Sequence, residues 1–183
     1  MRVIAGSARG KVLQTLPGED VTRPTIDRVK EAMFYSVQFL VPGARVLDLF
    51  AGSGQLGIEA LSRGAKSCTF LDRSEQALRV VAANCRAARV DRQADIRSGE
   101  ALAFLANARG PYDLVLLDPP YHHDILQAVL PALDHCVAPG GVVLCESEAE
   151  AALPDRAGAL TLQKQYRYGK IMVSRYEKEE PNQ

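Results

Sequence analysis

The sequence predicts an α/β fold built on one largely parallel sheet with helices on both faces. Three observations support this prediction: short apolar runs typical of buried strands, stretches of helical spacing between them, and a glycine-rich turn directly after the first run. Strands of a parallel sheet covered on both faces are apolar without alternation, as these runs are. The 183 residues suit one domain with a full hydrophobic core.

The composition is that of an ordinary globular protein, with 47% hydrophobic and 24% charged residues. The 22 basic and 22 acidic residues cancel, so the overall charge does not indicate a polyanionic partner. No apolar run approaches the ~20 residues of a membrane span, and the start lacks the apolar segment of a secretory signal. We therefore expect a cytoplasmic protein without membrane contact. The four cysteines form no C-x-x-C pair, which predicts structural thiols.

The chain divides into two expected parts. Residues 1–22 alternate and are broken by small residues, which predicts an N-terminal β-hairpin extension, and residues 23–183 form the main domain. A helix is expected after Pro24, capped by Thr25, because its apolar residues recur at helical spacing. These are Ile26, Val29, Met33 and Val37.

The remaining elements follow in alternation. Strands are expected at residues 45–50, 68–72, 94–99, 112–118 and 141–147, with helical spacing between them, as at residues 77–85. Residues 160–177 contain two alternating runs broken at Gly169, which predicts a closing hairpin.

A glycine motif, Gly52-x-Gly54-x-x-Gly57, lies between the first strand and a helix. Asp72 ends the next strand, about 20 residues later, at the spacing of a dinucleotide-binding site. Glycines let the backbone approach a ligand, and an acid at the second strand end accepts hydrogen bonds from ribose hydroxyls. The motif fits either a nicotinamide-dependent dehydrogenase or an enzyme that uses S-adenosylmethionine.

Asp48 favours S-adenosylmethionine. It lies inside the strand, where dinucleotide sites usually have apolar residues. A carboxylate there suits a cationic ligand such as the sulfonium amino acid and opposes a pyrophosphate. The alternative is a structural acid bonded to loop amides.

A second motif, Asp118-Pro119-Pro120-Tyr121, ends the fourth strand. Carboxyl ends of parallel strands face the ligand crevice, so Asp118 should face the cofactor. The prolines fix an extended backbone that exposes the Pro119 carbonyl beside Asp118. Two adjacent acceptors match the two N–H donors of an exocyclic base amine, and Tyr121 offers a ring on which the base stacks. The alternative is a strand that ends in a proline turn, with Tyr121 only packing.

The sequence resembles a known family over nearly its whole length. A D-P-P-Y motif after an F-x-G-x-G loop resembles methyltransferases that act on exocyclic nitrogens of nucleobases. The stretches MRVIAGSARGKVL, TRPTIDRVKEAMF, VLDLFAGSGQLGIEALSRGA and YDLVLLDPPY resemble the RsmD family. This resemblance implies a Rossmann-like class I S-adenosylmethionine-dependent methyltransferase with a seven-stranded, mostly parallel sheet after an N-terminal hairpin. It also implies methylation of guanine N2 in 16S rRNA of the small ribosomal subunit.

The resemblance also implies roles for individual residues. The Gly52/Gly54 loop would hold the methionine part of the cofactor with Asp48 near its amino group, Asp72 would bind the ribose, and Glu100 would approach the adenine. Asp95 is the alternative to Glu100. The complete expected cofactor set is Asp48, Phe50, Gly52, Ser53, Gly54, Asp72, Arg73, Glu100 and Ala101, and the expected catalytic set is Asp118, Pro119, Pro120 and Tyr121.

Basic residues are the expected RNA contacts. Arg2, Arg9 and Lys11 on the hairpin are the best candidates for phosphate contacts, followed by Arg23 and Arg28 near the first helix. The hairpin could instead be a solvated surface, and Arg28 and Lys30 could pair with Asp27 and Glu31 on an exposed helical face. His122 and His123 lack a third ligand at zinc-like spacing, so no metal is expected.

Other functions remain open from sequence. The D-P-P-Y motif also serves adenine N6 in DNA or RNA, and a non-catalytic RNA-binding or assembly factor would keep the same cofactor fold. A neutral chain with modest basic patches binds naked RNA weakly, which favours the 30S subunit or an assembly intermediate as substrate. We expect a monomer.

Overall fold

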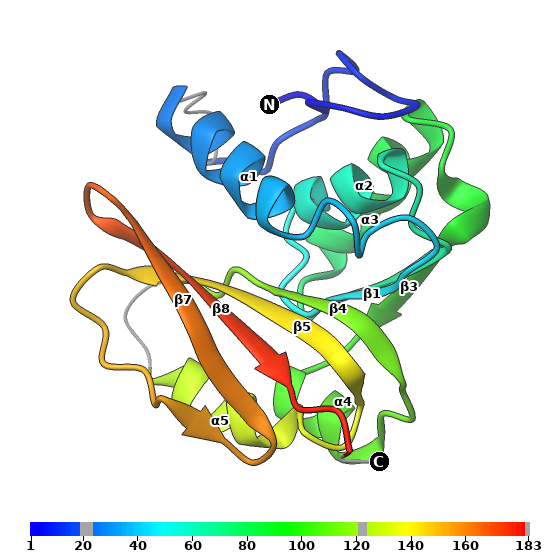
Figure 1. The fold of residues 1–183 in the computed structure, drawn as a ribbon. Coiled ribbons are helices and arrows are strands. Elements are labelled where there is room, and N and C mark those ends of the chain that lie inside the picture. The colour runs from blue at the N-terminus through cyan, green and yellow to red at the C-terminus, as the bar shows by residue number, and fades with distance from the viewer. Residues whose placement is uncertain (19–23, 121–123, 182–183) are drawn as a thin grey trace.

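One mixed β-sheet of eight strands runs through the molecule, in the order β3-β2-β1-β4-β5-β8-β7-β6 (Figure 1). The computed structural model describes residues 1–18, 24–120 and 124–181. The strands are β1 Arg45–Asp48, β2 Ser67–Asp72, β3 Ala94–Ser98, β4 Tyr112–Leu117, β5 Val137–Glu148, β6 Arg156–Ala157, β7 Leu160–Tyr168 and β8 Ile171–Lys178. The helices are α1 Pro24–Ser36, α2 Gln55–Ser62, α3 Glu75–Ala87, α4 Ala101–Asn107 and α5 Ile125–Ala132, with a short 3₁₀ helix at Asp91–Gln93.

Strands β1 to β5 are parallel, and the C-terminal strands are antiparallel. The chain builds β2 and β3 on one side of β1, then β4 and β5 on the other, so the strand order reverses at β1 and β4. In open α/β sheets a crevice forms at the carboxyl ends of the strands at such a reversal. The predicted fold class is confirmed. The sheet has an eighth strand because β6, two residues long, adds to its β7 edge.

Helices cover both faces of the sheet and create two cores. Figure 1 shows α1, α2 and α3 on one face and α4 and α5 on the other. Neighbouring residues of one strand serve different cores: Val46 packs in the first core and Leu47 in the second. Both are fully buried, which is why the strand is continuously apolar. Within the described residues, no helix is long and apolar enough to cross a membrane.

The N-terminal segment folds back on itself as expected, but its ladder is minimal. A single antiparallel bridge joins Arg2 and Val12, supported by the hydrogen bond from Val3 N to Lys11 O at 2.9 Å. Val3 and Leu13 are buried in the same core as α1 and α2, so the segment is packed onto the main domain. The expected boundary at residues 22–23 lies outside the described residues.

The four cysteines are free and buried, in agreement with the prediction of structural thiols. Burial raises the pKa of Cys85 to about 12 and that of Cys136 to about 11. A raised pKa disfavours the thiolate, which is the reactive form.

Candidate active site

A cavity of about 530 Å³ opens at the carboxyl edge of the sheet, where the loops after β1, β2, β3 and β4 meet. It brings together most of the residues that the sequence predicted for the site. The predicted residues on its wall are Phe50, Gly52, Asp72, Arg73, Glu100, Ala101, Asp118, Pro119 and Pro120. Asp48, Ser53 and Gly54 do not line it, and all three are buried.

The glycine loop connects β1 to α2, and the geometry of this connection requires glycine at two positions. Gly54 immediately precedes α2 with a φ of 83°, a left-handed conformation that glycine adopts without strain. At Gly57, a Cβ atom would lie 2.3 Å from the Phe70 ring and 2.7 Å from Cys68 Sγ. Glycine at this position therefore lets α2 pack closely on β2. Both features fix the path of the chain after Gly52, the loop glycine that lines the cavity.

Asp72 holds the loop from the neighbouring strand. Its Oδ2 accepts a hydrogen bond from Gly52 N–H at 2.9 Å, and its Oδ1 accepts one from Ser74 N–H at 2.9 Å. Each carboxylate oxygen has a second lone pair. Because Asp72 also lines the cavity, its carboxylate can accept hydrogen bonds from ligand hydroxyls.

Asp48 is a buried acid with an incomplete set of partners. Its Oδ2 accepts the Gly57 N–H at 3.0 Å, while its Oδ1 has no hydrogen-bond partner among the described residues. Burial raises the pKa of Asp48 to about 7, the Gly57 bond opposes this, and nearby Asp72 adds to it. An unpaired buried carboxylate oxygen beside the loop fits a ligand that carries a positive charge.

Glu100 and Asp95 are the alternatives for an acid that would face the adenine, and they differ in their position relative to the cavity. Glu100 immediately precedes α4 and lines the cavity, with its Oε1 3.8 Å from Nη1 of Arg73. Asp95 is absent from the described part of the cavity wall, and it pairs with Arg97 at 3.0 Å. The geometry therefore favours Glu100.

The loop after β4 brings three predicted catalytic residues to the same cavity. Asp118 is half-buried, Pro119 is buried and Pro120 is exposed. Proline has no N–H, so neither proline places a donor beside the Asp118 carboxylate. The fourth residue of the motif, Tyr121, lies outside the described residues, as do His122, His123 and Arg23.

The basic residues proposed to contact RNA are exposed but lie outside this cavity wall: Arg2, Arg9, Lys11 and Arg28. Lys30 differs from the expectation of an exposed helical face, because it is only 2% exposed. Its Nζ donates to Arg2 O at 2.8 Å and lies 3.5 Å from Glu59 of α2. Burial lowers the pKa of Lys30, and the Glu59 carboxylate opposes this effect.

Sequence reasoning missed two residues that shape the site. Leu16, from the N-terminal segment, lines the cavity. Asn84 of α3 bonds that segment through Gln14, with its Oδ1 accepting Gln14 N–H at 2.8 Å and its Nδ2 donating to Gln14 O at 3.0 Å. The same amide nitrogen donates to Ser53 O at 2.9 Å. The only signal in the sequence was a polar residue on the apolar face that Val81 and Cys85 share.

Known sequences match nearly the whole chain. A family model described as "Conserved hypothetical protein 95" matches residues 1–177. A Bacillus subtilis protein named "Putative rRNA methyltransferase YlbH" is 38% identical, with 97% of this chain and 99% of that protein covered. "Ribosomal RNA small subunit methyltransferase D" of Escherichia coli K12 is 31% identical, with 98% of this chain and 90% of that protein covered.

Solved structures match the fold equally well. The structure titled "Putative methyltransferase yhhF from Escherichia coli" superposes with a TM-score of 0.88 at 31% identity, covering 99% of both chains. An RNA methyltransferase from Salinibacter ruber in complex with S-adenosyl-L-homocysteine has a TM-score of 0.65 at 19% identity, covering 89% of this chain and 97% of that one. This second likeness concerns the fold alone.

Proposed function

Since the chain belongs to the RsmD family, described as Conserved hypothetical protein 95, we propose that it transfers a methyl group from S-adenosylmethionine to N2 of a guanine in 16S rRNA. The observation that carries this proposal is the shared cavity. Asp118 and Pro119 face the same space as the glycine loop and Asp72. A pair of amine acceptors thus lies beside residues suited to a nucleoside cofactor.

The residues around the cavity fit S-adenosylmethionine part by part. On the cavity wall, Asp72 suits the ribose hydroxyls and Glu100 suits the adenine. Asp48 is buried behind this wall, and its unpaired Oδ1 is proposed to attract the amino group. A positive charge beside Asp48 would offset the cost of burying that carboxylate. When bound, this cofactor supplies an electrophilic methyl group on its sulfonium.

Asp118 and the Pro119 carbonyl would orient the target amine. The nitrogen lone pair of a nucleobase amine is delocalised into the ring, which makes it a poor nucleophile. Two fixed acceptors that bind both N–H groups favour a pyramidal nitrogen whose lone pair points at the methyl donor. The Asp118 carboxylate also stabilises the positive charge that develops on the nitrogen. No covalent intermediate with the protein is needed, and Tyr121 is proposed to stack on the base.

The proposed substrate is a base that is extruded from its helix or already unpaired, because a paired and stacked base cannot enter an active-site pocket. Arg2, Arg9, Lys11, Arg23 and Arg28 are proposed phosphate contacts. The chain has zero net charge, which disfavours tight binding to naked RNA. We therefore propose that a monomer acts in the cytoplasm on the 30S subunit or an assembly intermediate.

Labelled methyl transfer tests this proposal. Purified protein receives labelled S-adenosylmethionine together with unmodified 16S rRNA, small subunits that contain it, or duplex DNA, and any modified base is mapped. We expect N2-methylguanine in the rRNA, with small subunits as the better substrate. Labelled adenine would instead assign an adenine-N6 activity. Binding of rRNA without transfer to any substrate would support a non-catalytic assembly factor.

A further inference from the structure

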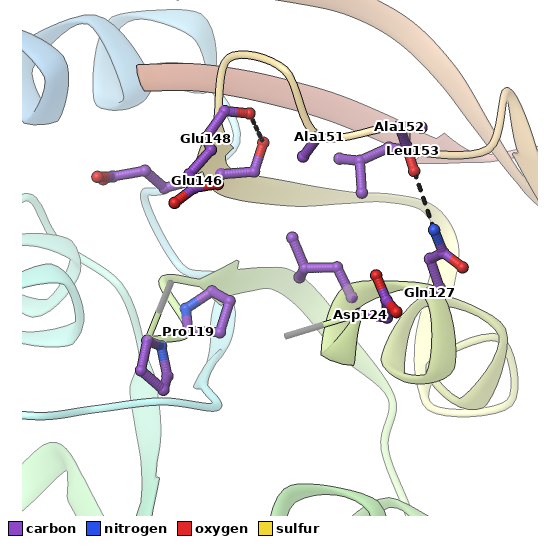
Figure 2. A pocket seen from close by; sticks show the side chains of 11 residues that line it. Pro119, Asp124, Gln127, Glu146, Glu148, Ala151, Ala152 and Leu153 are labelled. Carbon is purple, nitrogen blue, oxygen red and sulfur yellow. Dashed lines mark hydrogen bonds between the residues drawn. The ribbon is translucent and has the colours of Figure 1, made fainter. Parts of the chain in front are cut away.

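A second cavity of about 270 Å³ adjoins the first and shares two residues with it, Pro119 and Pro120. Figure 2 shows Pro119 on one side of this cavity and Glu146 and Glu148 of β5 on the other. We call it the β4–β5 pocket. This pocket lies across Pro119 and Pro120 from the first cavity. If the amine of the target base points toward the cofactor in the first cavity, the ring of the base would lie in the β4–β5 pocket.

The sheet register places Glu146 at the level of Asp118. Leu117, the last residue of β4, pairs with Cys145 of β5. The residues that follow this pair are Asp118, just beyond β4, and Glu146, still within β5. Neighbouring strands lie about 4.8 Å apart, so the two residues lie side by side at the carboxyl end of the parallel strands. Asp118 lines the first cavity and Glu146 lines the adjoining pocket. Glu146 is half-buried, whereas Glu148 and Asp124 on the same pocket are exposed. A half-buried acceptor discriminates ligands better than an exposed one, because water competes less for it.

We propose that Glu146 selects guanine by accepting a hydrogen bond from its N1–H, while Asp118 and the Pro119 carbonyl accept the two N2–H bonds. This inference rests on the function proposed above. Guanine presents N1–H next to its amine, so three adjacent donors meet three acceptors. Adenine has a lone pair on N1, which would face the Glu146 carboxylate without a proton between them. A site built to bind a donor rejects an analogue that lacks it, because its own polar group is left unpaired.

The pocket walls suit a planar base held in this orientation. Leu126 of α5 is buried and Leu153 is half-buried, and both line the pocket, so they offer apolar contact to the ring. Gln127 lies at the α5 side, where its Nε2 donates to Ala152 O at 3.2 Å and holds the loop after β5 against the helix (Figure 2). The proposed specificity of the pocket therefore depends on the Glu146 carboxylate, which lies among walls that the helix and the loop hold in place.

The test uses small subunits that carry unmodified 16S rRNA, with guanine or adenine at the position that the wild-type protein modifies. Glu146→Gln should lower kcat/KM on guanine about 10- to 100-fold and narrow the preference for guanine over adenine. Glu146→Asp, which keeps the charge but shortens the side chain, should also lose activity on guanine. Glu150→Gln is the matched control, because Glu150 pairs with Arg167 at 2.9 Å and does not line the described pocket.

Measuring the binding of S-adenosylmethionine shows whether a Glu146 variant loses activity at the base pocket or through a damaged cofactor site. Glu146 does not line the cofactor cavity among the described residues, so both Glu146 variants should bind the cofactor as wild type does. If wild type methylates guanine and Glu146→Gln keeps its kcat/KM and its base preference, this inference is overturned and the proposed function stands. If wild type transfers no methyl group to guanine, the proposed function fails and the inference fails with it.

Discussion

The proposed chemistry depends on two neighbouring oxygen acceptors with different origins. The Asp118 carboxylate supplies negative charge, and the Pro119 carbonyl supplies a direction that the following proline helps to fix. Both follow β4, whose last four residues, 114–117, are fully buried in the sheet. A rigid strand end limits the movement of both acceptors, which is what positioning a weak nucleophile requires.

Asp118→Ala should lower kcat by about 10²–10⁴-fold, because the variant loses both an acceptor and a stabilising charge. Asp118→Asn should retain part of the activity, since an amide oxygen still accepts one N–H bond. Transfer assays under single-turnover conditions measure both effects. Calorimetric binding of S-adenosylmethionine should stay near wild type. Full activity of the alanine variant would remove Asp118 from the mechanism.

Glu100 and Asp95 provide a matched pair for the cofactor cavity. Glu100→Gln should weaken binding of S-adenosylmethionine several-fold, since its carboxylate lines the cavity and would contact the adenine. Asp95→Asn removes an exposed ion pair with Arg97, and such pairs contribute little. Its dissociation constant should therefore match wild type. The reverse order of effects in calorimetry would assign the adenine contact to Asp95.

At the level of elements, helices α2 and α3 hold the N-terminal segment through side chains. Glu59 of α2 accepts Ile4 N–H at 2.9 Å and Ala5 N–H at 3.0 Å. Asn84 of α3 holds Gln14 and the glycine loop together. A segment with one β-bridge is thereby held against the proposed cofactor site, and its basic residues extend from a defined position.

Asn84→Ala should disturb the two segments that Asn84 of α3 binds, at Gln14 and at Ser53. The change leaves the polar groups of Gln14 and Ser53 without their bonds, at a cost of about 1–3 kcal/mol in the free energy of unfolding. We also expect roughly tenfold weaker binding of S-adenosylmethionine, because the loop at Ser53 loses its anchor.

Asn107→Ala is the control for this prediction. Asn107 is exposed at the end of α4 and bonds only its own helix in the hydrogen bonds recorded for the described residues, through Ala103 O at 3.3 Å. Its unfolding temperature and its dissociation constant for S-adenosylmethionine, measured by thermal unfolding and calorimetry, should stay close to those of wild type. If Asn84→Ala binds the cofactor as wild type does, the proposed anchor is not part of the site.

For the whole molecule, Asp48 makes stability depend on pH. Its pKa is about 4 in an unfolded chain and about 7 in the fold, where burial disfavours the charge. Between these values the folded state binds more protons, so the free energy of unfolding falls as pH rises. This contribution is fully present below about pH 4 and is lost as the pH passes through about 7.

Asp48→Asn should remove this dependence, since an amide resembles the protonated acid and does not titrate. Urea unfolding without cofactor measures this effect. From pH 5 to pH 8, wild type should lose on the order of a few kcal/mol in its free energy of unfolding relative to the variant. Asp113→Asn should show no such change between pH 5 and pH 8, because the hydrogen bond from Arg45 lowers the pKa of Asp113 and its carboxylate stays charged over this range. The stability that Asp113 contributes is lost only as the pH falls below about 4. An equal Asp48→Asn effect at both pH values would contradict the raised pKa.

Sequence patterns alone predict the α/β class, the glycine loop and the acids that follow the strands. These features depend on local rules: apolar runs form buried strands, glycine permits the Gly54 and Gly57 geometry, and acids that follow parallel strands meet at one edge. This is why Asp72, Glu100 and Asp118 could be placed together before their distances were known, although Asp95 remained an alternative to Glu100.

Contacts between residues far apart in the sequence became visible only in the folded molecule. Lys30 forms a buried pair with Glu59, Leu16 lines the proposed cofactor cavity, and Gln14 bonds Asn84 from 70 residues away. The β4–β5 pocket likewise depends on the register between two strands and on the helix that packs beside them. Such contacts have no local periodicity, because they arise from how whole elements dock, and docking is set by the shape of the complete core.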